Sequence, residues 1–447
     1  MQARTPTAAA TAEQAKEILI NNNKGGYTIP SARLYPFQWN WDSGFIALGL
    51  MYIDPQKAME EVRSMFKGQW SNGLLPHINF HHPDSNYFPG PAVWGTDSIA
   101  EKPAGIQTSG IVQPPVFGFV LQRMDQYFTQ NVAGWEAFIK ELFPQITAFH
   151  RYLYHHRDPY KEGLVYIHHN WEAGTDNSPA WDSILDNIDV SGMDNIVAQR
   201  RDTANVDAAQ RPTNENYKRY IYLLNLFKKH GYKDSAIVQE CPFLVQDVLF
   251  NALLARSNEG LIMLGKKYGL DVQEIVSWND KTVKAINRKL WNDSTGFYYA
   301  YDLKNGRTIP IKTSSGFMPL FAGVSNGQQA ARLCSHLSQS FARNSRWKLL
   351  PSTAADEPLF NALKYWRGPV WININWMLYH GLLRYGCIPE AEKVKKDSMQ
   401  LVEQYGPWEY FDPRPVEEGG MAQGLGGDLF SWSAALYLDM LLNDHPF

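Results

Sequence analysis

Residues 388–405 read Ile388-Pro-Glu-Ala-Glu-Lys-Val-Lys-Lys-Asp-Ser-Met-Gln-Leu-Val-Glu-Gln-Tyr405, and Gly406-Pro407 follow them. Apolar residues recur in this stretch at spacings of three, four and seven, which places them on one face of a helix. Pro389 suits a first helical turn, and Gly-Pro is a strong stop signal. The stretch therefore predicts an amphipathic helix over 388–405.

The same pattern extends through most of the chain. Tyr217, Ile221, Leu224 and Phe227 share one face of an expected helix that ends at Gly231. Further helices are expected over 11–22, 55–68, 109–126, 133–154, 214–230, 244–268, 272–290, 325–341, 370–385 and 431–443. Strand signals are few, and the clearest is a hairpin over 297–307 with a type I′ turn at Asn305-Gly306.

No alternating β/α pattern, GxGxxG motif, P-loop or Pro/Ser-rich linker divides the sequence. We therefore expect one all-α domain spanning 1–447. Two long segments rich in aromatic, Gly, Pro, Asn and Asp residues, at about 70–108 and 170–212, are expected to be ordered loops that form the active-site face, because long loops on a helical scaffold are usually functional.

Composition excludes several classes of partner. The 447 residues carry a formal net charge of −3, so there is no basic surplus for nucleic acid or for an anionic membrane. No apolar run reaches the length of a membrane span, and residues 1–12 lack the apolar core of a secretory signal. Cys241, Cys334 and Cys387 form neither a CxxC pair nor a zinc spacing, and we expect buried, reduced thiols. These features favour a cytoplasmic protein, and they are compatible with a homo-oligomer.

Aromatic residues make up 13% of the chain, and many occur beside polar residues in Pro- or Gly-containing segments. Examples are Tyr35-Pro-Phe-Gln-Trp-Asn-Trp41, Tyr87-Phe-Pro-Gly90 and Tyr365-Trp-Arg-Gly-Pro-Val-Trp371. Sugars have apolar C–H faces that pack on aromatic rings, so this clustering indicates a pocket for a small polar-ring ligand. A large helical core that simply buries many rings is the alternative for any single tryptophan.

The segment His168-His-Asn-Trp-Glu-Ala-Gly-Thr-Asp-Asn-Ser-Pro-Ala-Trp-Asp182 holds three carboxyls among small residues and two tryptophans. A carboxyl beside aromatic walls has a raised pKa and can donate a proton near neutral pH. Asp176, next to Asn177 and near Gly174, is the candidate general acid. Glu172 and Asp182 are expected to hold this loop through hydrogen bonds.

Glycoside hydrolysis needs a second carboxyl. Glu409 lies between aromatic residues just after the predicted helix stop, although its spacing alone is equally compatible with an exposed loop residue. Asp42 follows Trp39-Asn-Trp41, where it could accept hydrogen bonds from sugar hydroxyls or cap a helix.

Two arginines, Arg211 and Arg367, lie in Pro-containing loops from which a guanidinium can bind a carboxylate, and for Arg367 a structural salt bridge is the favoured interpretation. Three histidines, His77, His81 and His82, match no metal-ligand spacing, and no GxSxG motif occurs. We therefore expect no metal and no cofactor.

Taken in order, the motifs resemble glycoside hydrolase family 63, and within it the short mannosylglycerate and glucosylglycerate hydrolases. The matching pieces, spread from about residue 20 to 443, are Tyr35-Pro-Phe-Gln-Trp-Asn-Trp-Asp42, Gly73-Leu-Leu-Pro-His-Ile78, Tyr87-Phe-Pro-Gly-Pro91, Thr108-Ser-Gly-Ile-Val-Gln-Pro-Pro115, Trp171-Glu-Ala-Gly-Thr-Asp-Asn-Ser-Pro179, Gln210-Arg-Pro212, Tyr365-Trp-Arg-Gly-Pro-Val-Trp371 and Trp408-Glu-Tyr-Phe411. The variable positions of the acid loop differ from most relatives, and the extra N-terminal β domain of larger members is missing.

The resemblance implies an (α/α)6 barrel and an inverting mechanism, with Asp176 as general acid and Glu409 as general base. It places Asp42 on an acid that binds the sugar in the cleaved subsite. The remaining implied substrate-binding positions are Tyr35, Trp39, Trp41, Gln113, Trp171, Gly174, Trp366 and Trp371 for the sugar side, and Tyr87, Arg211 and Tyr217 for glycerate.

We therefore expect hydrolysis of 2-O-α-mannosylglycerate or 2-O-α-glucosylglycerate, a small-molecule glycoside whose aglycone is a carboxylate. The sequence does not choose between mannose and glucose, which differ in the orientation of one hydroxyl. The alternatives are a hydrolase of another small α-glucoside, such as trehalose, kojibiose or glucosylglycerol, and a non-catalytic sugar-binding protein on the same scaffold. A barrel isomerase or epimerase would need a histidine base that no motif provides.

Overall fold

The computed structural model describes residues 7–128, 132–342, 348–415, 419–420, 423–443 and 447. It is mainly helical. Its longer helices are α1 (Ala8–Asn22), α2 (Asn40–Leu50), α3 (Pro55–Phe66), α5 (Phe117–Tyr127), α6 (Trp135–His156), α8 (Asn214–Lys229), α10 (Val248–Tyr268), α11 (Gln273–Ala285), α13 (Gly327–His336), α14 (Ile372–Arg384), α15 (Ile388–Tyr405) and α16 (Ser431–Leu442). Shorter ones are α4 (Pro91–Trp94), α7 (Asp182–Leu185), α9 (Asp234–Glu240) and α12 (Met318–Phe321). Within the described residues, no helix is long and apolar enough to cross a membrane.

The helix predicted over 388–405 is confirmed as α15. Pro389 lies in its first turn, Ala391, Val394 and Leu401 are buried while Ile388 is 48% exposed, and Gly406 ends the helix with a φ of 86°. The helix predicted over 214–230 is confirmed as α8, which begins with a capping box between Thr213 and Asn216. In both helices, local start and stop signals agree with the hydrophobic period.

Two helices differ from expectation. α2 was not predicted because every one of its residues is buried, so its sequence lacks the polar face that produces a period. α5 begins at Phe117 rather than near 109, because Pro114-Pro115 lie upstream and a proline disfavours helical backbone in the residue before it. Residues 109–116 therefore form a loop, and Gln113 belongs to that loop.

Short strands tie the loops together. β1 (Gln38–Trp39), β2 (Ile78–Phe80) and β3 (Gln107–Thr108) form an antiparallel sheet in that order. A second sheet has the order β4 (Val245–Gln246), β7 (Tyr301–Asp302), β8 (Arg307–Thr308), and β5 (Trp291–Asn292) pairs with β6 (Phe297–Tyr298). The first sheet links the segment before α2 to the 70–108 region.

The predicted hairpin exists as β7–β8, but its turn is not type I′. Tyr301 pairs with Thr308 and Asp302 with Arg307, which leaves a four-residue loop between the strands. A type I′ turn needs positive φ at both central residues, whereas only Gly306 of this loop has one, at 64°. The Asp302 carboxylate accepts a hydrogen bond from the backbone N–H of Asn305, which favours this longer turn.

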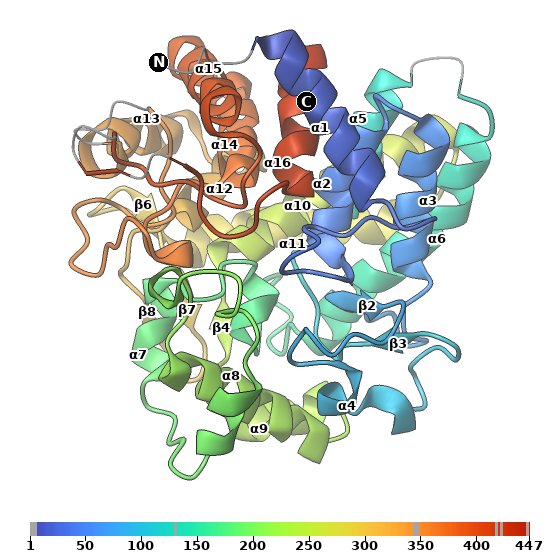
Figure 1. Ribbon diagram of the computed structural model, residues 1–447, viewed down its shortest axis with the longest axis vertical. Coiled ribbons are helices and arrows are strands. Elements are labelled where there is room, and N and C mark those ends of the chain that lie inside the picture. Colours follow the sequence, from blue (N-terminus) through green and yellow to red (C-terminus); the bar gives the residue numbers. More distant parts are fainter. Residues whose placement is uncertain (1–6, 129–131, 343–347, 416–418, 421–422, 444–446) are drawn as a thin grey trace.

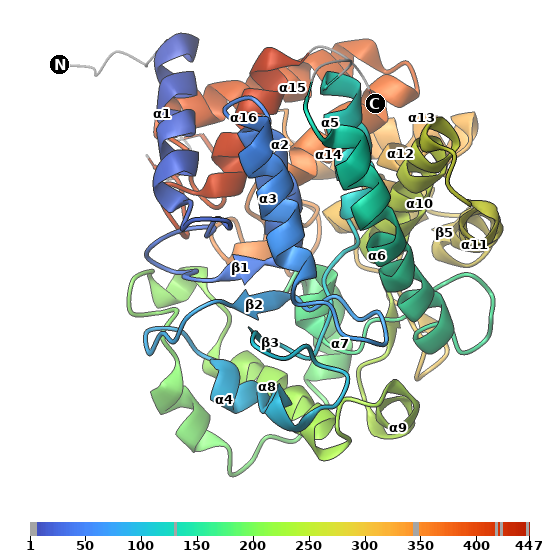
Figure 2. The same ribbon diagram turned by 90° about the vertical axis from the view of Figure 1, so that its right-hand side faces the viewer.

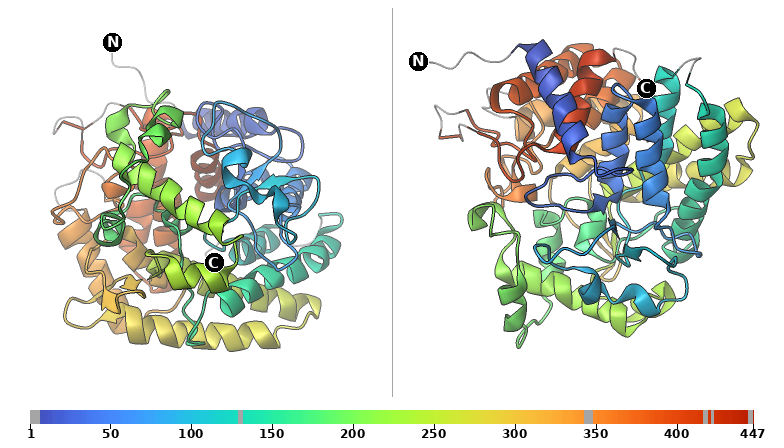
Figure 3. Two further views of the ribbon diagram at one scale, coloured as in Figure 1. Left: turned by 90° about the horizontal axis from the view of Figure 1, so that it is seen from below. Right: turned by 45° about the vertical axis from the view of Figure 1, so that its right-hand side comes forward.

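Helices distant in the sequence pack against one another. α16 contacts α1, α2, α14 and α15, while α10 contacts α5, α6, α11 and α12. Most of the longer helices gather in the upper half of Figure 1, whereas the long helix α8 lies in the lower half with the short helices α7 and α9. Figure 2 shows α1, α3 and α6 on the near side, with the β1–β2–β3 sheet below them. Seen from below, the green segment that contains α8 lies in front of the other helices (Figure 3).

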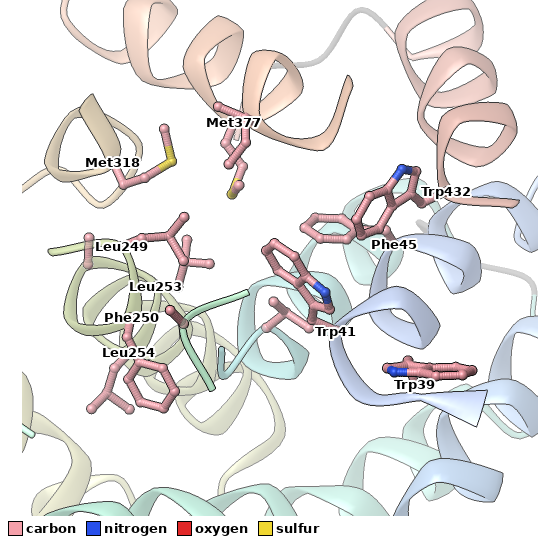
Figure 4. Close-up of a cluster of buried hydrophobic side chains, with 14 of the residues drawn as sticks. Trp39, Trp41, Phe45, Leu249, Phe250, Leu253, Leu254, Met318, Met377 and Trp432 are labelled. Carbon is pink, nitrogen blue, oxygen red and sulfur yellow. The ribbon is translucent and has the colours of Figure 1, made fainter. Parts of the chain in front are cut away.

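One hydrophobic cluster joins five of these helices (Figure 4). Trp41 and Phe45 come from α2, Met318 from α12, Met377 from α14 and Trp432 from α16, and α10 supplies Leu249, Phe250, Leu253 and Leu254. The side chains of all these residues are buried. Trp41 and Trp432 belong also to the pocket described below, so the core directly supports that pocket.

The cysteines are arranged differently from expectation. Cys241 is fully buried, whereas Cys334 and Cys387 are partly exposed and their sulfur atoms lie 3.1 Å apart. Fifty-three positions separate these two residues in the sequence, and the packing of α13 near the start of α15 brings them together.

Candidate active site

A deep pocket lies where the N-terminal ends of several helices meet the loops. It is lined from the first turns of α2 and α16, from the loops that precede α5 and α14, and from the 170–212 region. Its volume is about 950 Å³, counting the part open to solvent. Helix N-termini carry partial positive charge, so this arrangement favours negatively charged groups in the pocket.

The structure brings together thirteen of the fourteen residues predicted for the site. Those that line the pocket are Tyr35, Trp39, Trp41, Asp42, Tyr87, Gln113, Trp171, Gly174, Asp176, Arg211, Tyr217, Trp366 and Glu409. Trp371 does not line it. Its ring stacks on Trp366 at a centroid distance of 3.7 Å, and its Nε1–H donates to the carbonyl oxygen of Tyr365. Trp371 therefore supports the aromatic wall from behind.

Asp42 occupies the first turn of α2 but does not cap it. The N-cap position is Trp39, so the capping interpretation of Asp42 is wrong. The backbone N–H of Trp41 donates to Oε1 of Gln113, which fixes this turn against the loop before α5. Burial raises the pKa of Asp42 well above its usual range, and the negative charges of Glu409 and Asp176 add to the effect.

Asp176 projects from a loop built around Gly174. A 3-10 turn over Asn170–Ala173 ends at Gly174, whose φ of 72° and close packing against the Trp41 ring leave no room for a side chain. The Asn170 side chain donates to the backbone oxygen of Asp176. Burial raises the pKa of the Asp176 carboxyl to about 7, with Arg211 opposing this shift and Glu409 adding to it.

Two other carboxyls of the same segment anchor it, as expected. Glu172 is fully buried and accepts hydrogen bonds from Arg157 and from the backbone N–H groups of His168 and Val112. Burial alone would raise the pKa of Glu172, but the charges of Arg157 and His168 and the hydrogen bonds from both residues together lower it. Asp182 forms a bidentate salt bridge with Arg367 at 2.9 and 2.7 Å, which confirms the structural role expected for that arginine.

Glu409 is almost entirely buried, so the exposed-loop alternative is wrong. Its Oε1 accepts a 2.7 Å hydrogen bond from the Tyr35 hydroxyl, and its Oε2 accepts one of 2.9 Å from the backbone N–H of Gly427. Arg211 Nη1 lies 3.8 Å from Oε2. Burial raises the pKa of Glu409, while Arg211 and these hydrogen bonds oppose the rise.

Two tyrosine hydroxyls connect the two carboxyls. Tyr365 Oη lies 3.4 Å from Oδ2 of Asp176 and 3.3 Å from Oη of Tyr35, which in turn bonds Glu409. Tyr365 was not predicted as a site residue. Its backbone has a φ of 44°, a conformation that is strained for a side chain of this size and tends to occur at functional sites.

The third charged group in the centre of the pocket is Arg211, which is 6% exposed. Its guanidinium lies 4.3 Å above the Tyr365 ring, and its Nε is 3.3 Å from Oδ2 of Asp202. Nη1 has no hydrogen-bond partner within the described part of the chain. Of the two tyrosines predicted to accompany it, Tyr87 packs edge-on against Trp39, and the Tyr217 hydroxyl donates to the Phe88 carbonyl.

Further residues line the pocket that were not predicted as site residues. They are Arg33, Leu34, His77, Asn86, Phe88, Arg201, Asp202, Asn205, Pro212, Tyr365, Phe430 and Trp432. Several belong to the 170–212 region, so their loop was identified but their individual roles were not. The three histidines bond separately, His77 to Ser109, His81 to Gln38 and His82 to the Pro83 carbonyl, and the described residues contain no cluster suited to a metal ion.

A pocket of aromatic rings that holds two carboxyls in unlike environments is typical of glycoside hydrolases. The chain belongs to the mannosylglycerate hydrolase MGH1-like glycoside hydrolase family, whose family model matches residues 35–433.

Named relatives resemble the chain over nearly its whole length. It is 43% identical to a mannosylglycerate hydrolase of Thermus thermophilus, over 95% of this chain and 99% of the relative. It is 31% identical to a glucosylglycerate hydrolase of Mycolicibacterium hassiacum, over 98% of each chain. A crystal structure of the mannosylglycerate hydrolase from another strain of Thermus thermophilus, in complex with Tris and D-glycerate, has a TM-score of 0.89 at 42% identity, covering 96% of this chain and 99% of that one.

Proposed function

We propose that this chain hydrolyses 2-O-α-mannosylglycerate to mannose and glycerate, with 2-O-α-glucosylglycerate as the second candidate substrate. The activities named for the two relatives support these substrates, and the higher identity favours the mannosyl compound. The observation that carries the proposal is Arg211, a buried cation at the two pocket carboxyls whose Nη1 has no hydrogen-bond partner within the described part of the chain. Such a donor suits an aglycone that carries a carboxylate.

Asp176 is the proposed general acid and Glu409 the proposed general base. The raised pKa of Asp176, about 7, keeps a proton available at neutral pH for the leaving glycerate oxygen. Hydrogen bonds from Tyr35 and Gly427 favour the ionised form of Glu409. Asp176 gives its proton to the glycosidic oxygen as the C–O bond breaks. Glu409 takes a proton from the water whose oxygen bonds the anomeric carbon.

An inverting course follows if that water attacks from the face opposite the leaving group. Inverting enzymes separate their carboxyls by about 6.5–9.5 Å so that a water fits between them. The path from Asp176 through Tyr365 and Tyr35 to Glu409 has steps of 3.4, 3.3 and 2.7 Å, and their sum, which lies within this range, is the largest separation the two bonded oxygens can have. This upper limit is compatible with an inverting separation.

The sugar is proposed to occupy the aromatic end of the pocket. Trp39, Trp41, Trp171 and Trp366 offer ring faces, Asp42 and Gln113 offer hydrogen-bonding groups, and Gly174 and Tyr35 complete the enclosure. Trp371 contributes by holding Trp366 in place. The glycerate is proposed to lie toward Arg211, Tyr87 and Tyr217. Tyr217 keeps an acceptor lone pair for it, because its proton is used on Phe88.

We further propose that residues 1–447 form a single (α/α)6 barrel whose active-site face is built by loop insertions at about 70–108 and 170–212. The pairwise packing of α2 with α5, α5 with α10, α10 with α12, α12 with α14, α14 with α16 and α16 with α2 supports an inner ring. α1, α3, α6, α11, α13 and α15 are the proposed outer helices.

Steady-state kinetics with five substrates test the proposal: mannosylglycerate, glucosylglycerate, trehalose, kojibiose and glucosylglycerol. We expect a glycerate conjugate to have the highest kcat/KM. Arg211→Met should lower kcat/KM for the glycerate conjugates by about 30-fold or more, because truncating one partner of a buried charge pair costs about 2–5 kcal/mol. Neutral substrates should lose much less.

Arg63→Met, which removes an exposed arginine paired with Glu141, is the matched control and should leave all rates unchanged. A neutral disaccharide as best substrate, with Arg211→Met affecting every substrate equally, would mean another α-glycosidase. Sugar binding without turnover would mean a binding protein.

A further inference from the structure

Arg211 lies close to Glu409 and to Tyr365, the tyrosine that contacts Asp176. Its Nη1 is 3.8 Å from Glu409 Oε2, and its guanidinium lies over the ring of Tyr365, whose hydroxyl is 3.4 Å from Asp176. The arginine charge lowers the pKa of Asp176 and that of Glu409 against the effect of burial. One cation therefore acts on both groups of the proposed reaction.

The guanidinium is held in this position by an acidic partner, Asp202, which also lines the pocket. Asp202 accepts from Arg211 Nε at 3.3 Å and is itself held by Arg200, which donates at 3.1 and 2.8 Å. Arg200 also bonds the Pro212 carbonyl. Because Asp202 is fixed by Arg200, Arg211 keeps its orientation, and its Nη1 is left without a hydrogen-bond partner among the described residues.

Asp176 faces charged or titratable groups from several elements. Arg211 lies shortly before α8 and Tyr220 lies on it. The other groups are Asp42 on α2, Glu409 before α16, Tyr365 before α14 and Tyr87 in the 70–108 region. Among these groups, Arg211 is the one with a permanent positive charge. A change in how far that charge is neutralised therefore acts directly on the proton of Asp176.

We propose that Arg211 couples the binding of an acidic aglycone to the proton of Asp176, so that the acid holds its proton to a higher pH when the site is occupied. The inference rests on the proposed function. A carboxylate on Nη1 offsets the arginine charge and adds a negative charge to a buried pocket, and both effects disfavour the ionised form of Asp176. Substrates with this aglycone thereby keep the general acid protonated.

The two carboxyls respond unequally because their hydrogen bonds differ. Glu409 accepts short hydrogen bonds from Tyr35 and Gly427 that stabilise its ionised form. The side-chain contact between Asp176 and Tyr365 is longer, at 3.4 Å. The added proton is therefore taken up by Asp176, and Glu409 stays available as the base.

Calorimetric titration of the wild-type protein with D-glycerate tests the coupling without turnover. The ligand carboxylate is fully ionised at pH 7.5, so a proton taken up from the buffer on binding is bound by the protein and not by the ligand. A charge added a few ångströms away in a buried site raises a pKa by on the order of one. With a pKa near 7 in the empty site, binding at pH 7.5 should take up about half a proton per glycerate. Titrations in HEPES and PIPES, whose ionisation enthalpies differ, give the number of protons taken up per bound glycerate. Tris buffer is avoided because a relative was crystallised in complex with Tris.

Three outcomes are distinct. Proton uptake that disappears in Asp176→Asn supports the coupling. Binding without proton uptake, or uptake unchanged in Asp176→Asn, overturns the coupling and leaves the proposed function standing. No binding of D-glycerate overturns the aglycone assignment itself and the coupling with it.

Rate profiles give a second readout. With mannosylglycerate, the basic limb of kcat should lie at higher pH than that of kcat/KM, because kcat reports the occupied site. With mannosylglycerol, whose aglycone is neutral, the two limbs should coincide. Coinciding limbs for both substrates would contradict the coupling.

Discussion

The hydroxyl of Tyr35 donates a 2.7 Å hydrogen bond to Oε1 of Glu409, which joins the segment before α2 to the loop before α16. The bond holds the proposed base in one orientation and stabilises its negative charge. Tyr35→Phe should lower kcat by about 10- to 100-fold, since a hydrogen bond to a charged group contributes about 1.5–3 kcal/mol. Tyr437→Phe, which loses a similar bond to Glu403 far from the pocket, is the matched control. Equal rates for both variants would show that the Tyr35 bond has no role in turnover.

Gly426 lies against the proposed base and should tolerate no side chain. Its φ is 72°, and a Cβ there would collide with Oε2 of Glu409 and with the ring of Tyr410. Gly426→Ala should therefore displace the carboxylate and lower kcat/KM at least 100-fold. Gly269→Ala is the control, because Gly269 has a similar φ of 69° with open space around it. The control should lose about 1–2 kcal/mol of stability from backbone strain and keep its activity. Full activity in Gly426→Ala would contradict the placement of Glu409.

Activity should fall as pH rises through about 7. The folded-state pKa of Asp176 is raised to about 7 by burial, so the protonated acid is present below that pH and is lost above it. The basic limb of kcat/KM should then have a slope of one proton and a midpoint near 7. Asp176→Asn should reduce kcat by several orders of magnitude and leave folding intact. If Asp176 variants that retain some activity keep the basic limb at the same pH, the group that titrates there is not Asp176.

The same carboxyl should lower stability at alkaline pH. A carboxyl whose pKa is higher in the folded than in the unfolded state destabilises the fold as pH rises between the two values and remains destabilising above them. Asp176→Asn should therefore raise the denaturant midpoint at pH 8 more than at pH 4. An identical difference at both values of pH would show that ionisation of Asp176 carries no cost in the folded state.

A buried ion pair far from the pocket should matter only for folding. Asp439 accepts hydrogen bonds from Arg123, Tyr52 and Trp376 and so ties α5, α14 and α16 together. Asp439→Ala leaves the Arg123 charge buried and should lower the free energy of unfolding by about 3–5 kcal/mol. Glu141→Gln, in an exposed pair with Arg63, should change it by about 1 kcal/mol or less. Comparable losses in the two variants would contradict this difference.

The sequence predicted those elements whose signals are local. α8 begins with a capping box, α15 has Pro389 in its first turn and Gly406 at its end, and both have an apolar face, so their ranges follow from local signals and spacing. α2 has no polar face because all of its residues are buried, and no local signal marks it as a helix. The turn of the β7–β8 hairpin was mispredicted because the hydrogen bond from Asn305 to Asp302 favours a longer loop than the Asn-Gly pair indicates.

In the site too, features with a local sequence signal were predicted and features set by tertiary packing were not. Aromatic and acidic motifs indicated most of the pocket, but not which ring faces the cavity: Trp366 and Trp371 are five residues apart, and stacking hides one behind the other. Tyr365 contacts Asp176, which is 189 positions away, and Asp202 contacts Arg211 across an irregular loop whose shape no local signal predicts. Such contacts are set by tertiary packing, as is the approach of Cys334 to Cys387.

The most direct test of the central claim is the anomeric proton signal of the first sugar released from 2-O-α-mannosylglycerate, followed by NMR before mutarotation. Asp176 as acid and Glu409 as base, acting on opposite faces of the sugar, predict that β-mannose forms first and that neither Asp176→Asn nor Glu409→Gln produces it at a comparable rate. First release of α-mannose would mean retention through a covalent intermediate and would contradict the account.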